Sequence, residues 1–126
     1  MKLYGVSTGD GNNGVSHMFA DYYVQTDNPW RLARLALVAS FNDEWKARAL
    51  DAADIDGESE YTIRAVILDP LDEESYEDEE SWSSVNGAWL IVDVFPEDEP
   101  REGRPIYASL DDAFEPADLA LVPTED

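Results

Sequence analysis

Hydrophobic and polar residues near the start of the chain form two strand-like segments, and this pattern predicts a β-hairpin. Residues 2–8 and 15–25 are rich in β-branched and aromatic side chains, which favour strands. Between them, residues 9–14 consist only of Gly, Asp and Asn, and Gly and Asn tolerate the positive φ of tight turns. We therefore expect two strands that pair through this turn.

From Trp30 onward, apolar residues recur every three or four positions, which is the period of an amphipathic helix. Asn28 is a favourable N-cap, and Pro29 suits the first helical position. A second helix could begin in the polar segment 40–44, so one bent helix and two separate helices both remain open. Residues 54–57 have the polar composition and the final Gly of a solvated helix end.

The second half of the chain contains two clear strand patterns separated by an acidic segment. Residues 60–68 place β-branched and other apolar side chains at alternate positions, and residues 88–95 form a long apolar run. The segment 69–87 between them is predicted to be a loop, and loops of this length are usually functional or disordered. The shorter elements expected afterwards are a proline-containing loop over 96–105, a short strand over 106–108, a helical turn capped by Ser109, and a last strand or tail over 119–122.

These elements predict an α+β fold. We expect an antiparallel sheet of about four to five strands, with one or two helices packed on one face and the long acidic loop between two central strands. A chain of 126 residues is the size of one ordinary domain. The prediction is therefore a single domain over 1–126, made of a neutral hairpin and helix part (1–56) and an acidic strand, loop and strand part (57–126).

Charge is divided unevenly along the chain. Residues 1–50 contain five acidic and five basic residues, which cancel. Residues 51–126 contain the other 24 acids against three bases, and this difference accounts for the whole net charge of -21. Eight of the twelve residues 69–80 are acidic. Such a concentration destabilises a compact fold by self-repulsion, which indicates a need beyond solubility.

The absence of Cys excludes disulfides and thiolate metal sites and favours a reducing compartment. The chain shows no secretory signal pattern and no apolar run of the 18 residues that span a bilayer. We therefore expect a soluble protein of the cytoplasm that makes no membrane contact.

No pattern in the sequence supports catalysis. The glycines of segment 9–14 match the spacing of a dinucleotide-binding loop, but they precede a predicted strand where that loop requires a helix. A calcium loop beginning at Asp10 would have Val15 where Gly is required. The single histidine, His17, has no companion motif for a nucleophilic triad. We predict a protein that is not an enzyme and has no catalytic residues, metal site or cofactor.

Acidic runs that contain aromatic residues are the candidate binding surface. Large rings among charges serve as anchors in protein interfaces. The run that begins at residue 69 contains two such rings, and a second acidic run follows the strand 88–95. The predicted partner-binding residues are Asp69, Asp72, Glu73, Glu74, Tyr76, Glu77, Asp78, Glu79, Glu80 and Trp82, with Glu97, Asp98 and Glu99 as a secondary patch.

Dense carboxylates on a folded surface can imitate the charge of nucleic acid. Duplex DNA carries one negative charge per roughly 1.7 Å of its axis, and proteins bind it through grooves rich in Lys and Arg. A protein with comparable charge density can occupy such a groove and exclude the DNA. The predicted partner is therefore a basic nucleic-acid-binding protein or complex, and no direct contact with nucleic acid is expected.

In its runs 72–74, 77–80 and 97–99, the chain resembles the acidic DNA-mimic inhibitors of phages and mobile elements, which include anti-CRISPR and anti-restriction proteins. The resemblance is one of composition, because that class shares no motif, and no residue role is transferred by it. It implies a stoichiometric inhibitor of a nucleic-acid-handling complex, such as a CRISPR effector or a restriction enzyme, acting in the host cytoplasm.

Other classes of protein share parts of this pattern. An immunity protein or antitoxin that caps a basic nuclease or toxin uses the same electrostatics. A halophile-adapted domain would also be rich in acids and poor in Lys, although its acids usually cover the whole surface and residues 1–50 are neutral. A calcium-binding module is a further alternative, which a calcium titration followed by thermal melting would reveal.

Overall fold

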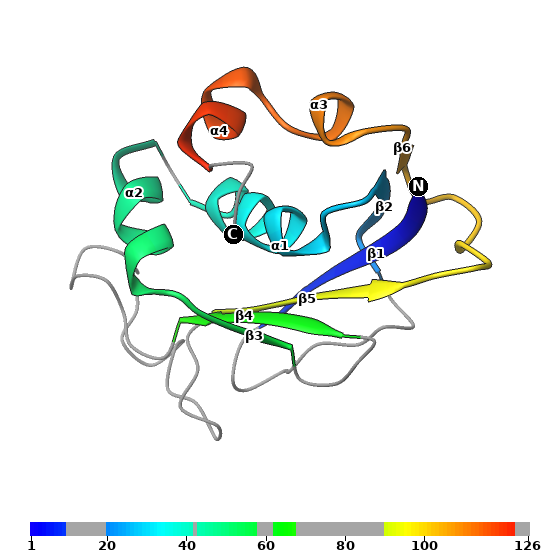
Figure 1. Cartoon of the computed structure of the whole chain (residues 1–126), viewed down its shortest axis with the longest axis horizontal. Coiled ribbons are helices and arrows are strands. Elements are labelled where there is room, and N and C mark those ends of the chain that lie inside the picture. Colours follow the sequence, from blue (N-terminus) through cyan, green and yellow to red (C-terminus); the bar gives the residue numbers. More distant parts are fainter. Residues whose placement is uncertain (10–19, 42, 58–61, 68–89, 123–126) are drawn as a thin grey trace.

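Six strands form one mixed sheet in the computed structural model, which describes residues 1–9, 20–41, 43–57, 62–67 and 90–122 (Figure 1). The strands are β1 (Lys2–Gly9), β2 (Tyr22–Thr26), β3 (Asp54–Gly57), β4 (Ile63–Ile67), β5 (Leu90–Pro96) and β6 (Ile106–Tyr107). The helices of the described residues are α1 (Pro29–Ala39), α2 (Asp43–Ala52), α3 (Leu110–Ala113) and α4 (Pro116–Leu121). These helices lie on one side of the sheet (Figure 1). The α+β class predicted from the sequence is confirmed.

The order of strands across the sheet is β3-β4-β5-β1-β2-β6. All neighbours are antiparallel except β2 and β6, which run parallel. The predicted sheet of four to five antiparallel strands was therefore too small, and its pairing was wrong at one edge. Residues 54–57 form the edge strand β3 and not a helix end, because their pairing with β4 overrides the weak strand preference of Asp and Gly.

Side-chain caps start two of the helices where the sequence placed them. The Oδ1 atom of Asn28 accepts a hydrogen bond from the backbone N of Arg31 at 3.0 Å, and Pro29 begins α1. Ser109 accepts a hydrogen bond from the backbone N of Asp112 at 3.2 Å and caps α3. The helical region consists of two separate helices, which settles the alternative left open by the sequence. The last strand or tail expected over 119–122 was wrong, since α4 occupies most of it.

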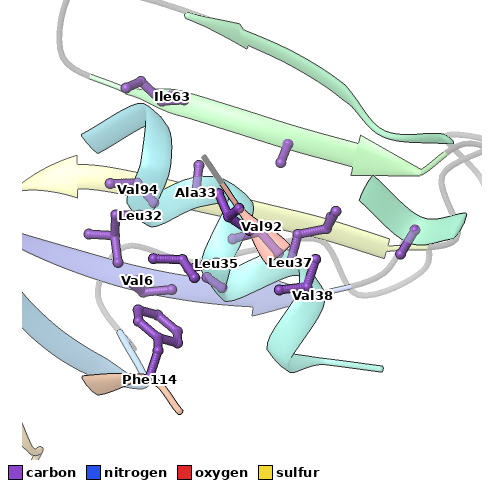
Figure 2. Packing of buried hydrophobic residues seen from close by; sticks show 14 of the residues in the cluster. Val6, Leu32, Ala33, Leu35, Leu37, Val38, Ile63, Val92, Val94 and Phe114 are labelled. Atoms are coloured by element: carbon purple, nitrogen blue, oxygen red, sulfur yellow. The ribbon is translucent and has the colours of Figure 1, made fainter. Parts of the chain in front are cut away.

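The main core lies between α1 and the sheet (Figure 2). Alternate residues of the strands point toward the helix, so that Val6, Val92 and Val94 meet Leu32 and Leu35. Full burial of each large apolar side chain contributes about 1.5–3 kcal/mol. The other buried members of this cluster are Val24, Ala33, Ala36, Leu37, Val38, Ala49, Ile63, Ala65, Ile67, Phe114 and Val122.

A smaller cluster occupies the face of the sheet that points away from the helices. It consists of Ala20, Tyr23 and Phe95, with Leu3 packed against it. Gly5 lies beneath the Phe95 ring, and a Cβ atom at that position would be 2.7 Å from the ring carbons Cε2 and Cζ. Glycine is therefore required here by the close approach of a cross-strand aromatic ring.

The same face carries a buried ion pair between the register partners Arg64 and Asp93. Arg64 Nε is 2.7 Å from Asp93 Oδ1, and Arg64 Nη2 donates to Asp93 Oδ2 at 2.9 Å. This bidentate geometry fixes both side chains. The Asp93 side chain is 1% exposed and the Arg64 side chain is 31% exposed. The pair therefore joins β4 to β5 at a point where an unpaired carboxylate would be costly.

Two basic side chains attach the C-terminal helix to the rest of the fold. Arg31 donates from Nη2 to the carbonyl of Leu119 at 2.9 Å and from Nε to that of Val122 at 3.2 Å, which satisfies carbonyl groups at the end of α4. Lys46 Nζ of α2 is 2.6 Å from the buried Asp118 Oδ1 of α4. These contacts position the helices on the sheet.

Candidate interaction surface

The structure describes only the secondary patch of the predicted binding surface. The predicted residues from Asp69 to Trp82, including the aromatic anchor Tyr76, lie outside the described residues. Glu97, Asp98 and Glu99 are described, and they follow directly after β5. The loop that carries these three residues is therefore the described part of the candidate surface.

The loop 97–105 crosses from one part of the sheet to another. It leaves β5, which lies beside β1, and reaches β6, which lies on the far side of β2. The backbone N of Arg101 donates to the Tyr23 hydroxyl at 2.9 Å, and the backbone N of Glu97 donates to the Leu3 carbonyl at 3.0 Å. Gly103 adopts φ 88°, a turn conformation that other residues rarely take. These contacts hold the loop against the second hydrophobic cluster.

The carboxylates of this loop are presented to solvent from a fixed backbone. Asp98 and Glu99 are exposed and Glu97 is half-buried. Glu97 Oε1 accepts a hydrogen bond from the backbone N of Glu99 at 3.1 Å, which orders the turn. An open hollow of about 570 Å³ adjoins the loop, and its lining residues are Met1, Lys2, Leu3, Pro96, Glu97 and Asp98. A loop held in this way loses little conformational entropy when a partner binds.

Exposed acids also occur well away from the predicted patches. Among the acids whose side chains the structure describes, Asp93 and Asp118 are buried. The exposed ones outside the loop run 97–99 are Asp21, Asp27, Asp51, Asp54, Asp56, Glu102, Asp111, Asp112 and Glu115. The sequence analysis did not select these acids as surface candidates, because it looked for runs of acidic residues and these occur singly or in pairs. Their exposure depends on their positions at strand edges and helix ends, which the sequence does not show.

All eight basic residues lie in the described ranges, and several of them serve internal contacts. Arg64 pairs with the buried Asp93, Lys46 pairs with the buried Asp118, and Arg31 binds carbonyl groups of α4. A base held by a buried partner neutralises that partner and does little for the exposed carboxylates. The exposed bases of the described residues are Lys2, Arg48, Arg101 and Arg104, and exposed acids outnumber them.

Three large hydrophobic side chains of the described residues are exposed: Met1, Trp30 and Ile106. Trp30 in the first turn of α1 is 36% exposed, and Ile106 of β6 is 53% exposed. The sequence pattern placed the start of the apolar stripe of the helix at Trp30, and its later members Leu32 and Leu35 are buried. The spacing of apolar residues predicts which face of the helix is apolar, but not where along the helix that face leaves the core. It therefore could not predict that Trp30 is exposed.

Tyrosines near the exposed acids stay protonated and add no charge. Burial and then the charge of Asp27 raise the pKa of Tyr4. Burial, the charge of Asp21 and the neighbouring Tyr107 raise the pKa of Tyr22 well above its ordinary value. The ring of Tyr22 also packs edge-on against Tyr107 and Phe114. These hydroxyls do not titrate near neutral pH.

No family model, curated protein or solved structure matches this chain. In the ranges that the structure describes, no group of three or more His, Asp or Glu side chains is arranged to hold a metal ion. Of the helices in those ranges, none has both the length and the apolar character needed to cross a membrane. The function is therefore argued from the charge and geometry of the surface itself.

Proposed function

We propose that the protein is a non-enzymatic acidic inhibitor that imitates the charge of nucleic acid and blocks the basic nucleic-acid-binding surface of a host defence complex, as anti-CRISPR proteins do. The observation that carries the proposal is the excess of exposed carboxylates over exposed bases in the described residues. Carboxylates project from the loop 97–99, from β3 and from α3, whereas Arg31, Lys46 and Arg64 are engaged in internal contacts.

The electrostatics of association support this function. A net charge of -21 on 126 residues creates a strong negative field, which steers the protein toward a groove lined with Lys and Arg. Carboxylates on an ordered scaffold make contacts without a large entropic cost. Such an inhibitor acts by occupying the groove, so it needs neither a cofactor nor a catalytic residue.

Capture from lysates of candidate host cells tests the proposal. With the purified protein as bait, we expect recovery of a basic nucleic-acid-binding complex at 0.15 M salt, where the Debye length is about 8 Å, and loss of it at 1 M salt, where the length is about 3 Å. Mass spectrometry identifies the recovered proteins. Recovery only of proteins without a nucleic-acid-binding surface, or recovery unaffected by salt, would contradict the proposal.

Two bait variants with the same change of charge show whether the loop takes part. The first replaces Glu97, Asp98 and Glu99 by their amides, and we expect it to recover less of the complex. The matched control replaces three exposed acids of the α3 region by their amides: Asp111, Asp112 and Glu115. Equal losses from both variants would show that total charge matters and that the loop has no particular role.

A further inference from the structure

The outer edge of β3 is a side of the sheet that no described strand covers. β3 is the first strand in the sheet order and pairs only with β4 in the described residues. In an edge strand of an antiparallel pair, alternate residues direct their N–H and C=O groups outward. Such groups form a template on which another extended segment can add as a strand.

Two carboxylates mark this edge. Asp54 and Asp56 are exposed and occupy alternate positions, so they lie on the same face of β3. Neither makes a hydrogen bond or ion pair in the described part of the chain. Ile55 between them is half-buried, packs against the main core and pairs with Ala65, which holds the strand in place. Pairing with β4 thus fixes the edge, and across that pair Asp56 lies opposite Arg64.

The opposite edge of the sheet differs in each of these respects. β6 contains only Ile106 and Tyr107, and it follows Pro105, which has no N–H to donate. Neither of its residues is charged. A strand of two residues offers too few backbone groups for a stable addition, whereas β3 is four residues long. The charged edge is the better template.

The charges of β3 select the kind of segment that fits. A second copy paired edge to edge would bring its own Asp54 and Asp56 against these carboxylates, and each copy carries a net charge of -21. Opposite charges across a strand pair stabilise it and like charges destabilise it. We propose that the edge of β3 binds an extended segment with Lys or Arg at alternate positions, which adds to the sheet beside β4.

This inference rests on the proposed function in one respect, namely that the partner is basic. It assigns a way of binding that charge imitation alone does not require: backbone hydrogen bonds give the added segment its register, and its basic side chains lie opposite Asp54 and Asp56. The expected orientation follows from the alternation, because every second side chain of the segment points to the carboxylate-bearing face.

The test uses a ten-residue peptide that alternates Lys and Thr, titrated into the full chain labelled with ¹⁵N. We expect chemical-shift changes concentrated in residues 54–57, and nuclear Overhauser contacts between the peptide Hα atoms and β3. The double variant Asp54→Asn, Asp56→Asn should weaken binding about fivefold, since two cross-strand charge pairs are lost. The control Asp111→Asn, Asp112→Asn removes the same charge elsewhere and should change the affinity less than about twofold.

A second peptide, N-methylated at alternate residues on the side that faces β3, keeps its charges but cannot donate hydrogen bonds to the edge. Loss of its binding is expected, and this arm does not depend on the folding of any variant. Shift changes spread over all exposed acids, equal sensitivity to both variants, or unaltered binding of the methylated peptide would overturn the inference. The proposed function would survive these results, because it requires only a basic partner and is tested by competition with DNA.

Discussion

Replacement of Asp93 by Ala is expected to lower the free energy of unfolding by about 3 kcal/mol, because it leaves the Arg64 guanidinium without its bidentate partner. This figure is at the low end of the range for a broken buried pair, since the Arg64 side chain is 31% exposed and keeps some access to water. Urea denaturation followed by circular dichroism measures the change in the free energy of unfolding. The melting temperature should fall by on the order of 10 °C.

The matched control is Asp98→Ala, which removes an exposed carboxylate just after the same strand and should change stability by less than about 0.5 kcal/mol. A second variant replaces both members of the pair, with Arg64→Met and Asp93→Leu, and should recover much of the lost stability because no unpaired charge remains. Similar melting temperatures for Asp93→Ala and Asp98→Ala would show that the ion pair does not support the sheet.

Replacement of the four acids 77–80 by Ser should slow association with the captured complex about tenfold at low ionic strength, and should flatten the salt dependence of the rate. The reason is that these residues form the densest part of the predicted patch. They lie outside the core predicted from the sequence, so the melting temperature should be unchanged. Stopped-flow fluorescence at several salt concentrations measures the association rate.

The control for this variant changes the same amount of charge in the described part of the chain. It replaces four exposed acids by Ser: Glu102, Asp111, Asp112 and Glu115. We expect a smaller decrease in rate, because the control leaves the predicted patch intact. If both variants associate at the wild-type rate, the assignment of the acidic run as the binding surface is wrong.

Local signals in the sequence predicted the elements that local chemistry determines. Asn28 followed by Pro29 marked the start of α1, and Ser109 marked the start of α3, because each cap is decided by hydrogen bonds within four residues. The strand β5 was visible as an apolar run because it is central and buried on both faces. These predictions are confirmed.

Non-local pairing explains what the sequence did not reveal. The composition of residues 54–57 predicted a helix end, and they form the strand β3 because β4 lies beside it. β6 pairs parallel to β2 because the loop 97–105 crosses the sheet. No pattern in the sequence of that loop predicts which strand β6 will pair with. α4 was missed because it is short and begins at Pro116, and its stability depends on Arg31 and Lys46, which are distant in sequence.

The candidate surface also has features that the sequence predicted and features that it did not. Runs of acids are visible in the sequence, and in the run 97–99 Asp98 and Glu99 are exposed on an ordered loop. The internal use of Arg31, Lys46 and Arg64 could not be predicted, because each contact joins residues 29 to 91 positions apart. The run 69–80 and its aromatic anchors remain a prediction from the sequence.

The central claim is that this protein and nucleic acid compete for one surface. The direct measurement is a titration of the captured complex with fluorescent duplex DNA, followed by anisotropy, at several fixed concentrations of the protein and constant salt. The account predicts mutually exclusive binding, so that the apparent dissociation constant for DNA rises in proportion to the protein concentration without reaching a limit. A ternary complex, in which the DNA affinity is unchanged or reaches a plateau, would contradict it.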